Sequence, residues 1–453
     1  MQNTFIYSAP PLFRVKNIFS IFMNYYSLNK SAPNVNFRQA TIQGQAPDKG
    51  LYFPENIPKV DDSVIENINQ YAKEELAFTI IQPYIGDEID KASLQKIISE
   101  TINFPFPLVA VNENIFSLEL FHGPTLAFKD VGARFMSRCL SYFSKNNSNK
   151  ITVLVATSGD TGGAVANGFL GVEGVEVVIL YPSGKVSPVQ ELQLTTCGQN
   201  IIALEVNGSF DDCQAMVKNA FIDGDLNKKM QLTSANSINI ARWLPQQLYY
   251  FFAYQQWKEK EPPVISVPSG NFGNICAGLL ANASGLPVRH FIAACNENDA
   301  VPEYLRTGHY QPKMAVPTIS NAMDVGSPSN FIRILELFQH NHKNISAKIS
   351  GFTVSDALTK QTIADIYEKY NYTLDPHGAV AFYALQQYLN KEPNAIGIIL
   401  ETAHPVKFPD TVEAMIGKEI VIPESARYLF AKEKQSIPID ASFDSLKEWL
   451  MNK

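Results

Sequence analysis

Short apolar runs, each followed by a turn and a helix-length segment, constrain the fold of this chain more than any other feature. They occur at 151–157 (ITVLVAT), 175–182 (VEVVILYP), 201–206 (IIALEV), 264–269 (VISVPS), 290–296 (HFIAACN) and 395–402 (AIGIILET). β-rich runs that alternate with helical stretches are typical of parallel sheets covered by helices. The sequence therefore predicts an α/β protein with two mostly parallel layers.

The segment that precedes these runs has a different pattern. Residues 54–103 place apolar side chains at helical spacing, and Asp61 and Asp62 stand where a helix would begin. We therefore expect a helical N-terminal region. In residues 1–22, Pro10 and Pro11 interrupt the apolar residues without the order of a signal peptide. We expect these residues to be a disordered leader or to precede the true start at Met23.

Composition excludes several classes of function. The net charge of -7 and the lack of any Lys/Arg run argue against a nucleic-acid partner. No apolar run approaches the roughly 18 residues of a membrane span. The five cysteines are an odd number and show no C-x-x-C pair, which favours a reducing, cytoplasmic compartment. The H-x-H pair at 340–342 lacks nearby Cys or acidic partners, so we expect no metal site.

One lysine stands out at the end of a further predicted strand. The stretch IFSLEL (115–120) leads into FHGPTLAFKD, where Lys129 lies between Phe128 and Asp130. A lysine carried off a strand end and against an aromatic ring has a pKa that can fall, and such a lysine can form a Schiff base. A solvated lysine in the first turn of a helix is the simpler alternative, and it is the commoner case for a lysine taken alone.

Two of the predicted strands run into glycine-rich turns. In ATSGDTGGAVA (156–166), backbone N–H groups with the hydroxyls of Ser158 and Thr161 could hold a carboxylate or phosphate. A plain N-cap is the alternative there. In VPSGNFGNICAG (267–278), Gly270 and Gly273 flank a turn whose N–H groups could converge on one phosphate, unless the glycines serve only helix packing. This turn lacks the P-loop ending and the G-x-G-x-x-G spacing, which counts against nucleoside triphosphates and NAD.

A third loop completes the pattern. ETAHPVKFPD (401–410) follows an apolar strand and leaves the neutral hydroxyl of Thr402 at its open end. Ligands bind at the carboxyl ends of the strands in open α/β sheets. A lysine, a phosphate cradle, an anion clamp and a neutral hydroxyl together match the needs of pyridoxal phosphate.

Five segments in this order, HGPTLAFKD, SGDTGGAVA, ANSINIARWLPQ, PSGNFGNICAG and TAHPVKFPD, resemble the threonine synthase family of fold type II pyridoxal-phosphate enzymes. The opening segment from Asn24 to Pro58 resembles the family's N-terminal signature. The resemblance implies two mostly parallel α/β domains of the tryptophan synthase beta-like class with a helical N-terminal region. The implied ranges are 23–103 for the N-terminal region, 104–129 with 251–453 for a large cofactor-binding domain, and 130–250 for a smaller domain.

The resemblance also implies roles for residues. Lys129, beside Phe128, would hold the cofactor as an imine and then move protons. The cofactor phosphate would bind to the loop of Gly270, Asn271, Phe272, Gly273 and Asn274. Thr402 would hydrogen-bond the pyridine nitrogen without holding it protonated. Asp160 stands where related enzymes often have an asparagine facing the ring oxygen, and a carboxylate there would need a shared proton.

For the substrate, the resemblance implies O-phospho-L-homoserine, which reacts with water to give threonine and phosphate. Its carboxylate would bind to Ser158, Gly159 and Thr161. Its phosphate would bind to Arg242, supported by Asn239 and Lys185, because a guanidinium fork suits phosphate. A salt bridge within the protein is the alternative for Arg242.

Two other functions stay open from the sequence. A serine or threonine dehydratase would use the same cofactor chemistry without a substrate-phosphate site, and a non-catalytic relative would only bind a ligand. The long N-terminal region argues against the first, and the retained lysine and cradle argue against the second. We expect a small-molecule substrate and a monomer or homodimer.

Overall fold

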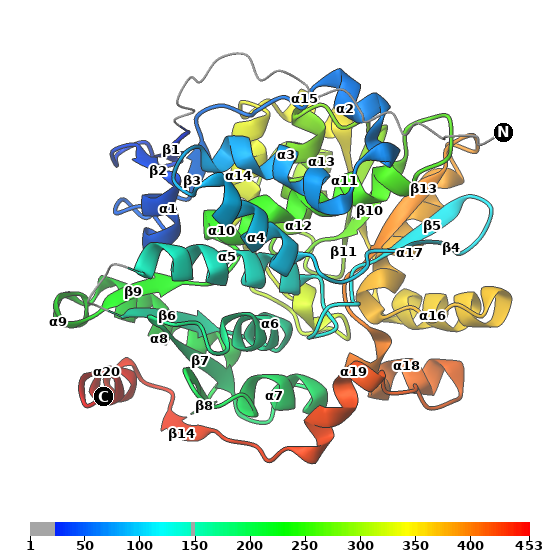
Figure 1. The fold of residues 1–453 in the computed structure, drawn as a ribbon. Coiled ribbons are helices and arrows are strands. Elements are labelled where there is room, and N and C mark those ends of the chain that lie inside the picture. The colour runs from blue at the N-terminus through cyan, green and yellow to red at the C-terminus, as the bar shows by residue number, and fades with distance from the viewer. Residues whose placement is uncertain (1–22, 146–149) are drawn as a thin grey trace, which may run out of the picture.

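The computed structural model describes residues 23–145 and 150–453, which form two mostly parallel sheets, a small antiparallel sheet and a layer of N-terminal helices (Figure 1). The expectation for residues 1–22 lies outside the described residues. No helix in the described ranges combines the length and the apolarity that a membrane span requires.

The larger sheet has six strands in the order β12-β11-β10-β13-β5-β4. Their bounds are β4 (Leu108–Ala110), β5 (Ile115–Glu119), β10 (Val264–Pro268), β11 (His290–Cys295), β12 (Ile349–Thr353) and β13 (Gly397–Glu401). All pairings are parallel except that of the edge strand β4. The central strands β10, β11 and β13 are buried along their whole length, which is typical of mostly apolar strands in a parallel sheet.

Helices cover this sheet on both sides. They include α11 (Gln247–Gln256), α12 (Gly273–Ala283), α13 (Ala300–Thr307), α14 (Phe331–Leu337), α15 (His342–Lys348), α16 (Asp356–Tyr370), α17 (Pro376–Leu389) and α18 (Pro409–Ile416). The apolar stretch LPQQLYYFFAYQQW (244–257) forms α11, preceded by the single turn η2 (Leu244–Gln246).

The smaller sheet has five parallel strands in the order β14-β8-β7-β6-β9. They are β6 (Ile151–Ala156), β7 (Val175–Pro182), β8 (Ile201–Asn207), β9 (Gln231–Ser234) and β14 (Ile437–Asp440). Its helices are α6 (Asp160–Phe169), α7 (Pro188–Thr195), α8 (Phe210–Ile222), α9 (Gly224–Lys229) and α20 (Phe443–Met451).

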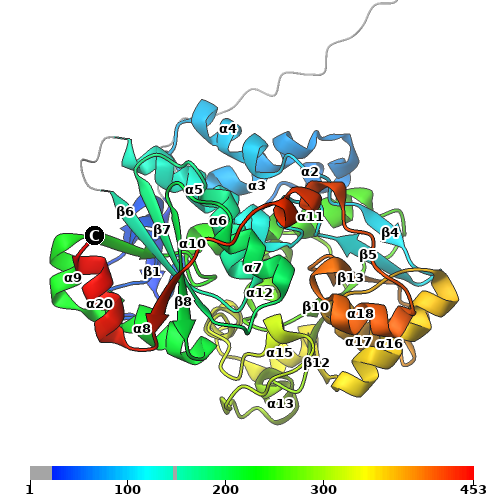
Figure 2. The same ribbon diagram turned by 90° about the horizontal axis from the view of Figure 1, so that it is seen from below.

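The last residues of the chain differ from the expected range of 251–453 for the larger domain. After α18 and α19 (Glu424–Arg427), the chain passes α7 and adds β14 to the edge of β8 (Figure 2). Leu446 and Leu450 of α20 are buried in the same apolar cluster as Leu204 of β8. The C-terminal end therefore packs with the smaller sheet, because burial of these leucines against β8 removes apolar surface from water.

The N-terminal region contains the expected helices, α2 (Asp62–Glu66), α3 (Lys73–Ile85) and α4 (Lys91–Thr101), and Asp61 caps the first of them. It also contains a small antiparallel sheet that the sequence analysis did not predict. Its strands are β1 (Asn24–Ser27), β2 (Val35–Asn36) and β3 (Tyr52–Pro54). Helix α1 (Phe37–Gln43) lies between β2 and β3 in the chain. Strands of two to four residues are too short to show the alternation by which a strand is predicted.

Candidate active site

Three loops meet where β10, β13 and β5 end, because these parallel strands are neighbours in the larger sheet. β5 leads through a short loop to Lys129, the first residue of α5 (Lys129–Ser144). β13 ends one residue before Thr402, and β10 ends just before the loop 269–274. Two of the three predicted loops, 267–278 and 401–410, follow the neighbouring strands β10 and β13, and parallel strands present these ends at one edge of the sheet. The third predicted loop, 156–166, follows β6 of the smaller sheet.

The loop that carries Lys129 is joined to the loop that carries Thr402. The backbone N–H of Phe128 donates to the carbonyl of Thr402 at 2.9 Å, and that of His404 donates to the carbonyl of Leu126 at 3.0 Å. The Tyr249 hydroxyl donates to the Phe128 carbonyl. These contacts fix the backbone on which Lys129 is placed and leave Thr402 94% buried beside it.

Asp130 stabilises the turn before Lys129 through hydrogen bonds to Thr125. Its carboxylate accepts hydrogen bonds from the backbone N–H of Thr125 at 2.9 Å and from the Thr125 hydroxyl at 2.6 Å. Burial raises the pKa of Asp130 to about 6, although the two hydrogen bonds oppose this shift. The acidic residue of the FKD motif therefore holds the loop and lies beside the site.

The side chain of Lys129 is half-buried, with Nζ 5.9 Å from the centroid of the Phe128 ring. Burial lowers the pKa of Lys129 to about 8, with Lys407 and Arg242 acting in the same direction and Asp160 opposing them. A lysine with this pKa exists partly as a neutral amine near neutral pH, which is the form that attacks a carbonyl carbon.

The loop after β10 has the geometry of an anion cradle. The backbone N–H groups of residues 270–274 make no hydrogen bond within the described part of the chain. Phe272 adopts a left-handed conformation with φ of 60° at the start of α12, which turns the loop sharply. The Asn271 side chain holds the loop by donating to Ser237 Oγ at 2.8 Å and by accepting from the backbone N–H of Ser329. Such a turn before a helix N-terminus suits a phosphate.

Replacement of Gly270 tests whether this cradle binds the cofactor phosphate. A Cβ atom at this position would lie 2.7 Å from Met323 Cα and 2.8 Å from the Ala322 carbonyl oxygen, so Gly270→Ala must displace the loop. We expect strain of about 1–3 kcal/mol, which would raise the dissociation constant of pyridoxal phosphate by about 5- to 150-fold. Equilibrium binding of pyridoxal phosphate, followed by absorbance, measures this effect.

The matched control is Gly224→Ala, because a Cβ there would meet no atom within 4 Å. This variant should bind the cofactor like the unaltered protein. Equal affinity of Gly270→Ala and the unaltered protein would show that the loop does not hold the phosphate.

The loop after β6 begins α6 and is built around Thr157. The Thr157 hydroxyl accepts from the backbone N–H groups of Gly159 at 3.0 Å and Gly162 at 2.8 Å. Gly159 has φ of 141° and packs against Gln190 so closely that a Cβ would lie 2.4 Å from that side chain. The hydroxyl residues Ser158 and Thr161, which were predicted to hold an anion, are half-buried in this turn. Thr157, whose hydroxyl orders the turn, was not among the predicted site residues.

Asp160 has a partner that the sequence analysis missed. Its Oδ1 lies 2.6 Å from Lys407 Nζ and also accepts from Gln190 Nε2 at 2.9 Å. Burial alone would raise the pKa of Asp160, but Lys407 and Lys129 hold it well below its ordinary value. The expected need for a shared proton is therefore replaced by an ion pair. The only sequence signal was a lysine five residues after Thr402 in TAHPVKFPD.

Arg242 lies in α10 (Ile240–Trp243), which packs directly on α5 at Gly132, one helical turn after Lys129. Its side chain is buried, with the whole residue 3% exposed, and Nη1 donates to the Ala235 carbonyl. Its Nε has no hydrogen-bond partner among the described residues. Burial lowers the pKa of Arg242 to about 10, which leaves it charged at neutral pH. A buried cation with an unpaired donor is suited to an anionic ligand.

The other two residues expected at the substrate phosphate lie differently. The Asn239 amide donates to the carbonyls of Thr41 at 2.9 Å and Ser234 at 3.2 Å, so both of its N–H donors are used within the protein. Lys185 is exposed and donates to the Gly208 carbonyl at 3.1 Å. Asn239 thus positions the segment before Arg242, and Lys185 is not in contact with Arg242.

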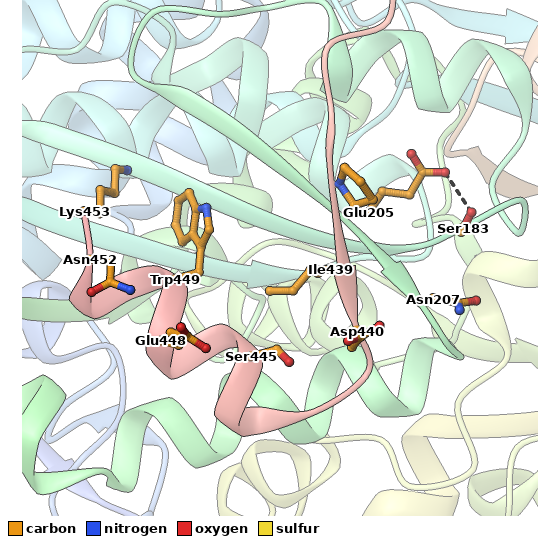
Figure 3. A pocket seen from close by; sticks show the side chains of 11 residues that line it. Ser183, Glu205, Asn207, Ile439, Asp440, Ser445, Glu448, Trp449, Asn452 and Lys453 are labelled. Carbon is orange, nitrogen blue, oxygen red and sulfur yellow. Dashed lines mark hydrogen bonds between the residues drawn. The ribbon is translucent and has the colours of Figure 1, made fainter.

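A surface groove of about 900 Å³ lies elsewhere, between the ends of β8 and β14 and helix α20 (Figure 3). None of the residues named for the site lines it. Its carboxylate Glu205 already accepts from Ser183 at 2.7 Å and pairs with Lys434 at 2.8 Å. Its lysine, Lys453, pairs with Glu176 at 2.7 Å, and no glycine-rich turn of the described chain lines the groove.

The residues around Lys129 fit pyridoxal phosphate. The cradle offers unpaired N–H groups, and its glycine lies where a Cβ would collide with neighbouring backbone. Lys129 has a lowered pKa, and Thr402 supplies a hydroxyl rather than a carboxylate. Three family models match the chain: threonine synthase N terminus over 24–102, pyridoxal-phosphate dependent enzyme over 103–400, and threonine synthase C-terminal over 378–450.

The chain belongs to the threonine synthase family. It is similar to threonine synthase from Haemophilus influenzae, with 44% identity over 431 residues that cover 95% of this chain and 100% of the relative. The crystal structure of threonine synthase from Escherichia coli matches with a TM-score of 0.88 and 42% identity, covering 95% of this chain and 99% of that one. The pyridoxal-phosphate-bound threonine synthase from Brucella melitensis matches with a TM-score of 0.88 and 33% identity, at 95% and 99% coverage.

Membership of the threonine synthase family confirms the predicted fold class and cofactor. The chain is a pyridoxal-phosphate-dependent lyase of the fold type II class.

Proposed function

We propose that the chain converts O-phospho-L-homoserine and water into L-threonine and inorganic phosphate, the last step of threonine biosynthesis. One observation carries the choice of a phosphorylated substrate. Arg242 is buried beside the helix that starts at Lys129 and has an unpaired Nε. A site for an unphosphorylated amino acid would not need a buried guanidinium at this position.

The residues that would hold the cofactor follow from the site. Lys129 would attach it covalently, and the backbone N–H groups of the loop 270–274 would bind its phosphate. Thr402 would hydrogen-bond its ring nitrogen without keeping that nitrogen protonated. When bound, pyridoxal phosphate acts as an electron sink that lets substrate carbons lose protons.

The remaining residues would orient the substrate. The start of α6, at Ser158, Gly159 and Thr161, would bind the substrate carboxylate, because helix N-termini favour anions. Arg242 would bind the substrate phosphate. Lys129 would take a proton from the α carbon and move protons at the β carbon, which its lowered pKa permits near neutral pH.

The experiment follows both products. Purified protein supplied with pyridoxal phosphate and O-phospho-L-homoserine should release phosphate and L-threonine in equal amounts. Serine and threonine are tested as alternative substrates in separate reactions. Faster formation of keto acids from serine or threonine would favour a dehydratase, and no turnover of any of the three would favour a ligand-binding role.

The cysteines support a cytoplasmic location for this reaction. All five are unpaired, and four of them are buried. Thiols persist in reducing compartments, whereas oxidising compartments favour disulfides.

A further inference from the structure

Lys407 and Asp160 form an ion pair inside the protein, next to Lys129. The two side chains are 0% and 3% exposed and their charged atoms lie 2.6 Å apart. Lys407 Nζ also donates to the Thr125 carbonyl at 3.0 Å, and Gln190 Nε2 donates to Asp160. Both charges are thus fixed by neutral hydrogen-bond partners as well as by each other.

The two residues lie in helices that follow strands of different sheets. Lys407 ends the single-turn helix η4 (Pro405–Lys407), which follows β13 of the larger sheet. Asp160 is the first residue of α6, which follows β6 of the smaller sheet. Thr125, which accepts from Lys407, also binds Asp130 in the turn just before Lys129. The pair therefore lies where both sheets approach the loop of Lys129.

A buried ion pair is rarely a gain in stability, because removing two charges from water costs several kcal/mol per ion. A role in balancing charge near Lys129 would explain why an ion pair is buried at this position. Lys129 is held toward its charged form by Asp160 and toward its neutral form by Lys407. Either charge alone would shift Lys129, whereas the pair together carries no net charge.

We propose that Lys407 is a positioning residue that holds Asp160 as a carboxylate at the start of α6 and cancels its charge, so that Lys129 is available as a neutral amine near neutral pH. This inference rests on Lys129 being the lysine that attaches the cofactor. In that step the Lys129 amine forms a bond to the aldehyde carbon of the cofactor, and the aldehyde oxygen leaves as water.

The test measures how fast the cofactor-free protein takes up pyridoxal phosphate as a function of pH, followed at the absorbance of the lysine-bound cofactor. Only the neutral amine reacts, so the rate should rise as Lys129 loses its proton, with a midpoint at about pH 8, and level off at higher pH. Lys407→Met removes a positive neighbour and should move the midpoint of this rise up by about 1 pH unit. Asp160→Asn removes a negative neighbour and should move it down by a similar amount.

The double variant Asp160→Asn/Lys407→Met provides the matched control. It removes both charges, so its midpoint should return close to that of the unaltered protein. Arg242, Asp130 and His404 also face this cluster, and they are unchanged in all four proteins. Their contributions to the midpoint therefore cancel in the comparison.

The outcomes separate this inference from the proposed function. Single-variant midpoints that stay in place, or that move in the same direction, would overturn the charge-balance role. A role in folding alone would slow uptake at every pH without moving the midpoint. If Lys407→Met does not fold, the downward shift of Asp160→Asn decides the question. Failure of the unaltered protein to form the band at any pH would instead count against Lys129 as the cofactor lysine.

Discussion

Lys129→Ala should abolish the absorbance band of the lysine-bound cofactor and lower kcat by about 10⁴-fold or more. The variant loses the amine that attaches the cofactor and the group that moves protons, and no other lysine replaces it. Lys407 acts electrostatically on Lys129 and is a candidate, but its Nζ is fixed to Asp160 at 2.6 Å and to the Thr125 carbonyl. Absorbance spectra and phosphate release, measured on the same preparation, check both effects.

Lys91→Ala is the matched control for this variant. Lys91 is also the first residue of a helix, α4, but it is exposed. Its replacement should leave the band and the rate unchanged. A band that persists in Lys129→Ala, with activity retained, would show that another amine holds the cofactor.

The layers of the fold could be predicted because their signals are local. Each central strand is a mostly apolar, β-rich run, and each of these runs falls on an observed strand. Strand β14 could not be predicted, because its four residues are largely exposed and gain their place only by pairing with β8. The N-terminal sheet was missed for the same reason, since β2 has two residues and takes its position from β1.

The site divides along a similar line. Lys129, the cradle and Thr402 were predicted because each follows a strand, and parallel neighbours bring their ends together. Lys407 was missed because its partner Asp160 lies 247 positions earlier in the chain and no pattern in the sequence links the two. Asn239 was expected at the substrate, but its amide is used by Thr41 and Ser234, which only the packing of α1 reveals.

Thr125 connects these groups and shows why the loop before Lys129 needs its particular residues. Its N–H and hydroxyl bind Asp130, while its carbonyl accepts from Lys407 at 3.0 Å and from Gln193 Nε2 at 2.9 Å. Gln193 belongs to α7 of the smaller sheet. A movement of α7 would therefore be felt at the loop that places Lys129, through one backbone carbonyl.

Arg242→Met should raise KM for O-phospho-L-homoserine by about 100-fold while leaving the cofactor band in place. The variant keeps an apolar stem of similar length and removes the charge. A guanidinium that binds phosphate with two charge-assisted hydrogen bonds contributes roughly 3 kcal/mol, which corresponds to this factor. Inhibition by inorganic phosphate should weaken by a comparable factor, because the same cation would bind it. Steady-state kinetics with substrate and with added phosphate measure both.

Arg138→Met is the control for the loss of an arginine on or beside α5. Arg138 lies on α5 and pairs with the Glu100 carboxylate at 2.9 Å, away from the cradle and Thr402. Its replacement should leave KM unchanged. Arg242→Met also removes a donor from the Ala235 carbonyl, so a lower Tm by itself would be a structural effect of about 1 kcal/mol. A raised KM at temperatures well below Tm separates phosphate binding from folding, whereas an unchanged KM would assign Arg242 to packing against α5 alone.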